Sequence, residues 1–265
     1  MNNITFDELK VPRLPQKMTE PAEGYFLASL QIFGLFNFVV NTVISGDYMT
    51  YIAKKALAGE EIEKEIDPAI LASKEPGPRT FQLRKYRQEL LQAIFSRIVD
   101  NFEVYLVDIL REVLKQKPEI LRSRQQNITL EYLLQFQKIE DLIQDIIERK
   151  VNSLSYKGFL DIKQWYEEKG IPLIVDKEHS QGVVEIIAMR NIIVHNRGRV
   201  DEKYLRAIPT SSIKIGELRE LSVDYLFSTL SILNTIVSET DHEIAQKFDL
   251  VTNFENKTFT NFESS

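Results

Sequence analysis

An arginine, an asparagine and a histidine lie close together in the segment Gln181–Arg199, which reads QGVVEIIAMRNIIVHNRGR. Its apolar residues recur at helical spacing, and at about 100° per residue Arg190 falls in the middle of the apolar face. Asn191 and His195 are four residues apart and share the flank of that face. The segment therefore predicts a helix that presents a guanidinium, an amide and an imidazole toward other protein.

These three side chain types are suited to cleaving RNA without a metal ion. In that reaction the 2′-hydroxyl attacks the adjacent phosphorus, so protons must be moved and added negative charge must be stabilised. Histidine suits proton transfer because its reference pKa is near neutrality, and arginine is a permanently charged donor for phosphoryl oxygens. Asn191 could orient the histidine or donate to a phosphate oxygen. The alternative is structural: Arg190 pairs with a carboxylate elsewhere in the fold, and His195 is a satisfied histidine near the helix end.

The hexapeptide RNIIVH resembles the signature motif of the HEPN family, in which four residues separate an arginine from a histidine and a polar residue follows the arginine. Val99–Leu121 is also similar to the earlier long helix of such domains, so the resemblance covers roughly Phe81 to Phe248. It implies an all-α, HEPN-like helical bundle that acts as a metal-independent endoribonuclease without a cofactor. Its implied catalytic residues are Arg190, Asn191 and His195.

A single chain offers only one histidine in this group, whereas transesterification is best served by a separate acid and base. We therefore expect a homodimer whose two motif helices line one composite cleft, as the resemblance also implies. Such a cleft would explain an arginine on an apolar face. The resemblance further implies a toxin–antitoxin or antiviral defence context, with RNA as substrate and an antitoxin or other defence-system protein as partner. The alternative is a catalytically inactive HEPN-like module that dimerises or binds RNA.

Some HEPN relatives are controlled by a nucleotidyltransferase that modifies a tyrosine two residues after the motif histidine. In this chain that position is Arg197, and the nearest downstream tyrosine is Tyr204. The departure argues against this mode of control here.

Basic residues are concentrated after the motif, with five between positions 190 and 206 against two acidic ones. This local charge is compatible with a phosphate-bearing substrate, although alternating surface charge is the commoner explanation of such a pattern. The candidate RNA-binding residues are Arg197, Arg199 and Lys203.

The composition favours helices and limits the other chemistry. The chain has 265 residues and a formal net charge of −6, which argues against a protein that coats long nucleic acid non-specifically. It has no cysteine and three scattered histidines, so disulfides and thiol catalysis are excluded and a metal site is not expected. No basic-then-apolar signal peptide opens the chain, which predicts a cytoplasmic protein.

The N-terminal part, residues 1–79, is predicted to contain an irregular arm, an apolar helix and an acidic connector. Gly24–Ile44 has no charged residue and is long enough to span a bilayer. Internal polar residues and acidic flanks argue against a membrane span. We expect this helix to be buried at the centre of a bundle or in a dimer interface, and we expect the domain boundary within Gly59–Arg79.

Residues 80–248 are predicted to form the HEPN-like domain, followed by a polar tail over 249–265. Asp176 or Ser180 is expected to cap the motif helix and Gly198 to end it, and SSIKIGE (211–217) to include a short extended piece. Hydrophobic spacing predicts the other helices at Thr80–Gln116 (one helix, or two in line), Thr129–Phe136 with Ile139–Val151, Tyr156–Lys169 and Leu218–Phe248.

Overall fold

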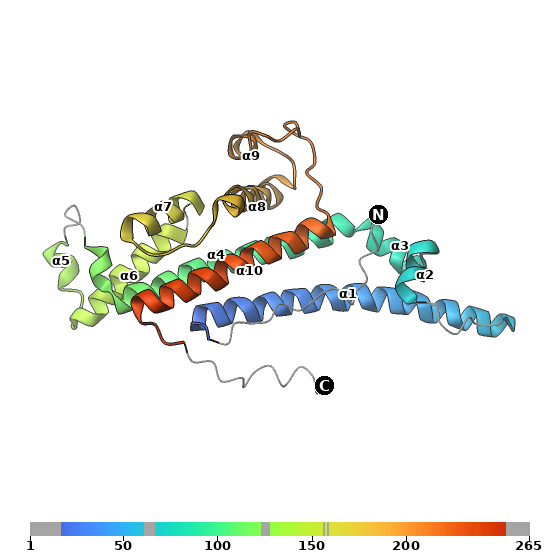
Figure 1. Cartoon of the computed structure of the whole chain (residues 1–265), viewed down its shortest axis with the longest axis horizontal. Helices are drawn as coiled ribbons and strands as arrows, with labels where there is room; N and C mark the ends of the chain where they lie inside the picture. The colour runs from blue at the N-terminus through green and yellow to red at the C-terminus, as the bar shows by residue number, and fades with distance from the viewer. Residues whose placement is uncertain (1–16, 61–66, 123–127, 156, 158, 253–265) are drawn as a thin grey trace. The chain divides into compact units, whose positions relative to one another are not determined.

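The computed structural model describes residues 17–60, 67–122, 128–155, 157 and 159–252 (Figure 1). The regular structure in these residues is helical, and the one β-type pairing among them is an isolated bridge between Arg199 and Leu218. The all-α prediction is confirmed. The elements are α1 (Glu20–Ala58), α2 (Pro68–Lys74), α3 (Pro78–Lys85), α4 (Arg87–Gln116), the 3-10 helix η2 (Pro118–Leu121), α5 (Leu130–Leu133), α6 (Ile139–Ser155), α7 (Phe159–Lys169), α8 (Lys177–Asn196), α9 (Glu202–Ala207) and α10 (Val223–Phe248).

The chain forms two compact units, each assembled from segments that are distant in sequence. Unit 1 contains the described residues within 1–26, 105–174 and 235–265, and unit 2 contains those within 27–104 and 175–234. The predicted boundaries at 79/80 and 248/249 do not coincide with this division. The physical reason is that α1, α4 and α10 are long helices that each contribute residues to both units.

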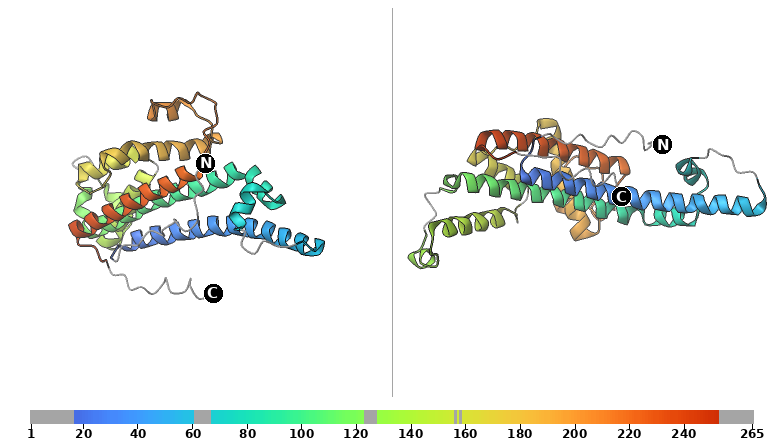
Figure 2. Two further views of the ribbon diagram at one scale, coloured as in Figure 1. Left: turned by 45° about the vertical axis from the view of Figure 1, so that its right-hand side comes forward. Right: turned by 90° about the horizontal axis from the view of Figure 1, so that it is seen from below.

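Unit 1 has a core of apolar side chains from α4, α6, α7 and α10. Within it, the buried Tyr166 hydroxyl donates to the carbonyl oxygen of Leu106 at 2.6 Å, so α7 is fixed to α4 by a bond that satisfies a buried polar group. Thr19 directly precedes α1 and donates through its amide and its hydroxyl to the carboxylate of Asp241, at 2.9 and 2.5 Å. Figures 1 and 2 show α10 lying alongside α4.

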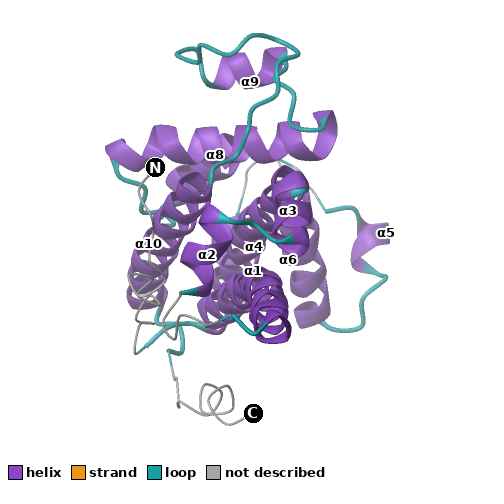
Figure 3. Ribbon diagram, turned by 90° about the vertical axis from the view of Figure 1, so that its right-hand side faces the viewer, coloured by secondary structure: helices purple, strands orange, loops and turns teal. Residues whose placement is uncertain are grey.

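Unit 2 contains the motif helix α8, which crosses α4 and α10 (Figure 3). Its inward face is buried and apolar, and Phe95 of α4 stacks on Tyr225 of α10 with ring centroids 5.8 Å apart. Asp47 of α1 is buried and accepts from the amides of Thr80 (2.7 Å) and Arg79 (3.2 Å) in the first turn of α3. The buried residues of the α8 face are Val183, Ile186, Ile187, Met189 and Ile192.

The helices follow the hydrophobic periodicity closely, with small differences at their ends. The predicted Thr80–Gln116 stretch consists of two helices in line, α3 and α4, with a break at Tyr86. The predicted connector Gly59–Arg79 includes α2 and the start of α3, besides residues 61–66 outside the described part. SSIKIGE forms no strand. The isolated bridge in this region joins Arg199 to Leu218, just after the segment. The tail beyond residue 252 lies outside the described residues.

Helix α1 is less buried than expected. Among the described helices it alone is long and apolar enough to cross a membrane, and 17% of its most apolar window is buried. Leu35, Phe38 and Met49 are 57%, 67% and 65% exposed. The expectation that this helix lies at the centre of the bundle is therefore wrong for the single chain. Length and composition do not separate a membrane span from a helix that a second copy covers.

Candidate functional site

The motif helix α8 begins and ends where its flanking residues predict. It starts directly after Asp176, whose carbonyl oxygen accepts from the amide of Ser180 at 2.9 Å. It is closed by the amide of Gly198, which donates to the carbonyl of Ile192 at 2.9 Å. Gly198 has φ +74°, and a Cβ there would lie 2.9 Å from Nε2 of Gln92. The backbone conformation favours glycine here, and a Cβ would in addition displace the end of the Gln92 side chain.

Arg190 is paired with two carboxylates of α4. Its Nε and Nη2 lie 2.9 and 2.7 Å from Oδ1 of Asp100, and Nη2 lies 3.6 Å from Oε2 of Glu103. The arginine side chain is 22% exposed. The structural alternative for this residue, pairing with a carboxylate elsewhere in the fold, is therefore confirmed. The pair stabilises the contact between α8 and α4, since removing either partner leaves a partly buried charge.

Arg190 and the two carboxylates beside it, Asp100 and Glu103, form a group with a net negative charge. Burial raises the pKa of Glu103, the guanidinium of Arg190 lowers it, and the nearby charge of Asp100 raises it; the net effect is a pKa above the ordinary glutamate value. Glu103 consequently retains a proton to a higher pH than an exposed glutamate does. The arginine is held on one side by this carboxylate pair.

Asn191 and His195 lie on the outer side of α8. The Oδ1 of Asn191 accepts from Nη1 of Arg190 at 3.2 Å, and both Asn191 and His195 are exposed. Within the described part of the chain the imidazole of His195 makes no hydrogen bond or ion pair. On an ideal helix, Arg190 and His195 leave the axis about 140° apart and about 7.5 Å along it. The structure thus joins Arg190 to Asn191, whereas helix geometry sets the His195 position about 140° around α8 from the arginine.

The three candidate RNA-binding residues are exposed and belong to unit 2. Arg197 follows the end of α8 with φ +55°, and Arg199 donates through Nη1 to the carbonyl of Gly216 at 2.9 Å. Lys203 lies on α9, a helix that contacts α8. Neither Arg197 nor Lys203 forms an ion pair with a described residue. These side chains are therefore available to a negatively charged ligand.

Two acids that matter here were not singled out from the sequence. Asp100 and Glu103 are three residues apart on the long helix α4, so they share one face. The signal was present in part, because a central arginine on the apolar face of α8 required a carboxylate, but nothing in the spacing of α4 marked these two acids as its partners. A second arginine, Arg219, reaches Glu185 of α8 at 3.2 Å, so α8 is held by ion pairs on two sides.

Among the described residues, no group of three or more histidine, aspartate or glutamate side chains is arranged to hold a metal ion. Comparisons of the chain with protein-family models, curated proteins and solved structures found no match. The HEPN resemblance therefore stays a prediction from the motif residues Arg190, Asn191 and His195 and from their place near the end of a long helix. The arrangement offers a partly buried guanidinium, an exposed amide and an exposed imidazole.

Proposed function

We propose that this protein is a metal-independent endoribonuclease of the HEPN type, with an active site shared by two copies of the chain. The observation that supports this most directly is the imidazole of His195, which is exposed and makes no hydrogen bond or ion pair with any described residue. The amide of Asn191 lies one turn before it on the same side of α8. An imidazole in this position is free to exchange a proton with a substrate.

The proposed reaction is an internal transesterification. The 2′-oxygen forms a bond to phosphorus, the bond from phosphorus to the 5′-oxygen breaks, and the products carry a 2′,3′-cyclic phosphate and a 5′-hydroxyl. His195 of one copy takes the proton of the 2′-hydroxyl, and the second copy's imidazole gives a proton to the leaving oxygen. Arg190 stabilises the negative charge on the phosphorane through Nη1, because its Nε and Nη2 donate to Asp100.

In this proposal Asp100 is a positioning residue. Two hydrogen bonds to a single carboxylate oxygen fix the plane of the guanidinium and turn Nη1 toward Asn191. The exposed cations Arg197, Arg199 and Lys203 would bind the RNA backbone on either side of the cleaved bond. The proposal also places the protein in the cytoplasm, away from membranes, in a toxin–antitoxin or antiviral defence system with an antitoxin or similar partner protein.

A second function is favoured by the ion pairs of Arg190. Two carboxylates around one guanidinium give that site a net negative charge, which weakens its attraction for a phosphate. In this alternative the protein is a catalytically inactive HEPN-like module. Arg190 then serves only to hold α8 against α4, while the exposed residues of α8 bind RNA or a second copy.

A cleavage assay on the full chain distinguishes these two functions. Labelled RNA is incubated with the wild type, His195→Ala and His242→Ala in the presence of EDTA, and the product ends are identified. His242 is the matched control, an exposed histidine that contacts Gln246 in unit 1. We expect His195→Ala to lose about 100-fold or more of the activity and His242→Ala to lose none.

Two other results of this assay would contradict the ribonuclease proposal. Wild-type protein that retards RNA in a gel but never cuts it would favour the inactive module. Activity that disappears with chelator would indicate a metal-dependent mechanism. For the cellular context, expression of the wild type should arrest growth and expression of His195→Ala should not. Fractionation of the same cells tests the cytoplasmic location, because α1 is long, apolar and exposed enough that protein in the membrane fraction would contradict it.

A further inference from the structure

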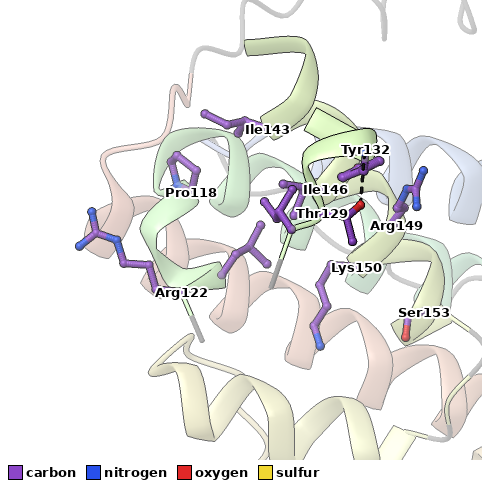
Figure 4. A pocket seen from close by; sticks show the side chains of 11 residues that line it. Pro118, Arg122, Thr129, Tyr132, Ile143, Ile146, Arg149, Lys150 and Ser153 are labelled. Carbon is purple, nitrogen blue, oxygen red and sulfur yellow. Dashed lines mark hydrogen bonds between the residues drawn. The ribbon is translucent and has the colours of Figure 1, made fainter. Parts of the chain in front are cut away.

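Unit 1 contains a cavity far in sequence from the motif. It has a volume of about 650 Å³ and lies among η2, α5 and α6 (Figure 4). This volume is in the range of sites that bind small molecules. The lining residues are Pro118, Leu121, Arg122, Ile128, Thr129, Tyr132, Ile143, Ile146, Arg149, Lys150 and Ser153.

Five of the residues that line this cavity are aliphatic, and two of these, Ile143 and Ile146, come from α6. Ile143, Ile146, Lys150 and Ser153 follow one another at spacings of three, four and three residues, so they share one helical face. Around the helix this α6 stripe lies between the buried Leu142 on one side and the buried Leu154, Ile147 and Val151 on the other. Its two apolar residues, Ile143 and Ile146, are only half-buried, so part of the apolar face of α6 is left open to the cavity. Burying that stripe under an apolar ligand would be favourable.

The charges at the cavity are positive. Three cations and no acid are among its lining residues. Arg149 is paired with Asp145 at 2.6 Å, whereas Arg122 and Lys150 form no ion pair with any described residue. Burial lowers the pKa of Lys150, and the charges of Lys157 and Lys169 lower it further, against a smaller opposing effect of Glu168. A negative group placed beside Lys150 would relieve this repulsion.

The single aromatic ring at the cavity is already engaged. Arg149 lies over the ring of Tyr132 at 4.6 Å, Phe136 packs against it edge-on, and its hydroxyl donates to Asp145. The cavity thus offers no open aromatic face on which a nucleobase could stack, in contrast to typical sites for single-stranded nucleic acid. An aliphatic body fits the isoleucine stripe better than a flat aromatic one does.

We propose that this cavity binds an anionic amphiphile, a molecule with a carboxylate or phosphate head on an aliphatic chain. The chain lies along the α6 stripe, and the head is held by Lys150, while Arg122, whose side chain points away from Lys150 in Figure 4, adds positive charge at the rim of the cavity. This site is in unit 1, whereas the motif residues are in unit 2, so it is independent of the proposed ribonuclease activity.

The chain contains one tryptophan, which provides the measurement. The Nζ of Lys150 lies 4.9 Å from the centroid of the Trp165 ring, so an anion bound to Lys150 should change the tryptophan fluorescence. The full-length protein is titrated with decanoate and with decyl phosphate below their micelle concentrations. We expect a saturable change with one or both, and the tighter probe identifies the head group. Decyltrimethylammonium, 1-decanol and inorganic phosphate should bind at least tenfold more weakly.

Variants locate the site. Lys150→Met should weaken decanoate binding about tenfold, the size expected for one charge-assisted contact, and Arg122→Gln should weaken it by a smaller factor because its guanidinium lies away from Lys150. Arg122→Gln leaves Lys150 beside the tryptophan, and calorimetry provides a second readout for Lys150→Met. The control is Lys138→Gln, which removes an exposed cation that does not line the cavity and should change nothing. Equal binding of the cationic and anionic probes, equal effects of all three variants, or binding only to anionic vesicles would overturn the proposal.

Discussion

Replacing Arg190 by alanine should destabilise the protein even if the residue also acts in catalysis. The pair with Asp100 has N–O distances of 2.7 and 2.9 Å, and the two side chains are 22% and 36% exposed. Fully exposed pairs contribute at most about 1 kcal/mol, whereas breaking a buried pair costs about 3–5 kcal/mol. For this partly buried pair we expect Arg190→Ala to lower the free energy of unfolding by about 2 kcal/mol.

Replacing Asp100 should lower the free energy of unfolding less than replacing Arg190 does. Asp100→Ala leaves Glu103 at 3.6 Å to take over part of the pairing, so its cost should be smaller, about 1 kcal/mol. Arg190→Ala instead leaves both acids without their cation. A double-mutant cycle over Arg190 and Asp100 should therefore show a coupling energy of about 1 kcal/mol or more.

Urea unfolding followed by circular dichroism gives all of these values. His195→Ala belongs in the same series, and because the imidazole is exposed we expect it to change stability by less than about 0.5 kcal/mol. An Arg190→Ala variant as stable as wild type, with no coupling to Asp100, would refute the inference that this ion pair holds α8 against α4. These stabilities also help to interpret the cleavage assay. If His195→Ala is as stable as wild type, its loss of activity comes from the missing imidazole and not from unfolding.

Three further predictions concern pH and the helix ends. Asp47 is buried, which raises its pKa, but the amides of Thr80 and Arg79 outweigh this and the net pKa is lowered. Its contribution is therefore present above about pH 4 and lost as the pH falls through the lowered folded-state pKa, so Asp47→Asn should cost about 1–2 kcal/mol at pH 7 and progressively less in acid urea melts. The pKa of Glu103 is raised instead, so its ionisation disfavours the folded state. Its contribution to stability therefore changes with pH in the opposite direction to that of Asp47. Glu103→Gln should thus be more stable relative to wild type at pH 7 than near pH 4, and the reverse order would contradict the assignment. Gly198→Ala should lower the melting temperature more than Gly170→Ala: both glycines have positive φ, but a Cβ meets Gln92 at 2.9 Å in the first and only Lys247 at 3.8 Å in the second.

The amino-acid sequence predicts much of the helical structure because helix formation depends on local spacing. The face of α8, its start at Asp176 and its end at Gly198 follow from residues within or next to the helix. The expectation that Arg190 needs a carboxylate is of the same local kind, since it depends on the arginine lying on an apolar stripe. These features are set by interactions across a few residues.

The features that the sequence did not predict depend on contacts across long separations. The partner of Arg190 is Asp100, 90 residues earlier in the chain, and periodicity identifies a face but not what packs against it. The division into two units has the same origin, because segments such as 27–104 and 175–234 come together only in the folded chain. The exposure of Phe38 on α1 is also a tertiary property, which the apolar composition of the helix alone does not determine.

The angle between Arg190 and His195 has a consequence for how two copies would work together. If the two side chains leave α8 about 140° apart, and Asp100 holds the arginine on the α4 side, then one chain is poorly arranged to bring both to one phosphate. The ribonuclease proposal therefore requires that Arg190 of one copy act with the second copy's imidazole. Arg190→Ala and His195→Ala chains, co-expressed with different tags and purified as the mixed dimer, retain one such crossed pair. That dimer should cut RNA faster than either parent homodimer, although more slowly than wild type because one imidazole is missing. A mixed dimer as inactive as its parents would overturn the claim that a crossed pair alone supports cleavage, and would leave either two residues acting within one chain or a strict need for both imidazoles.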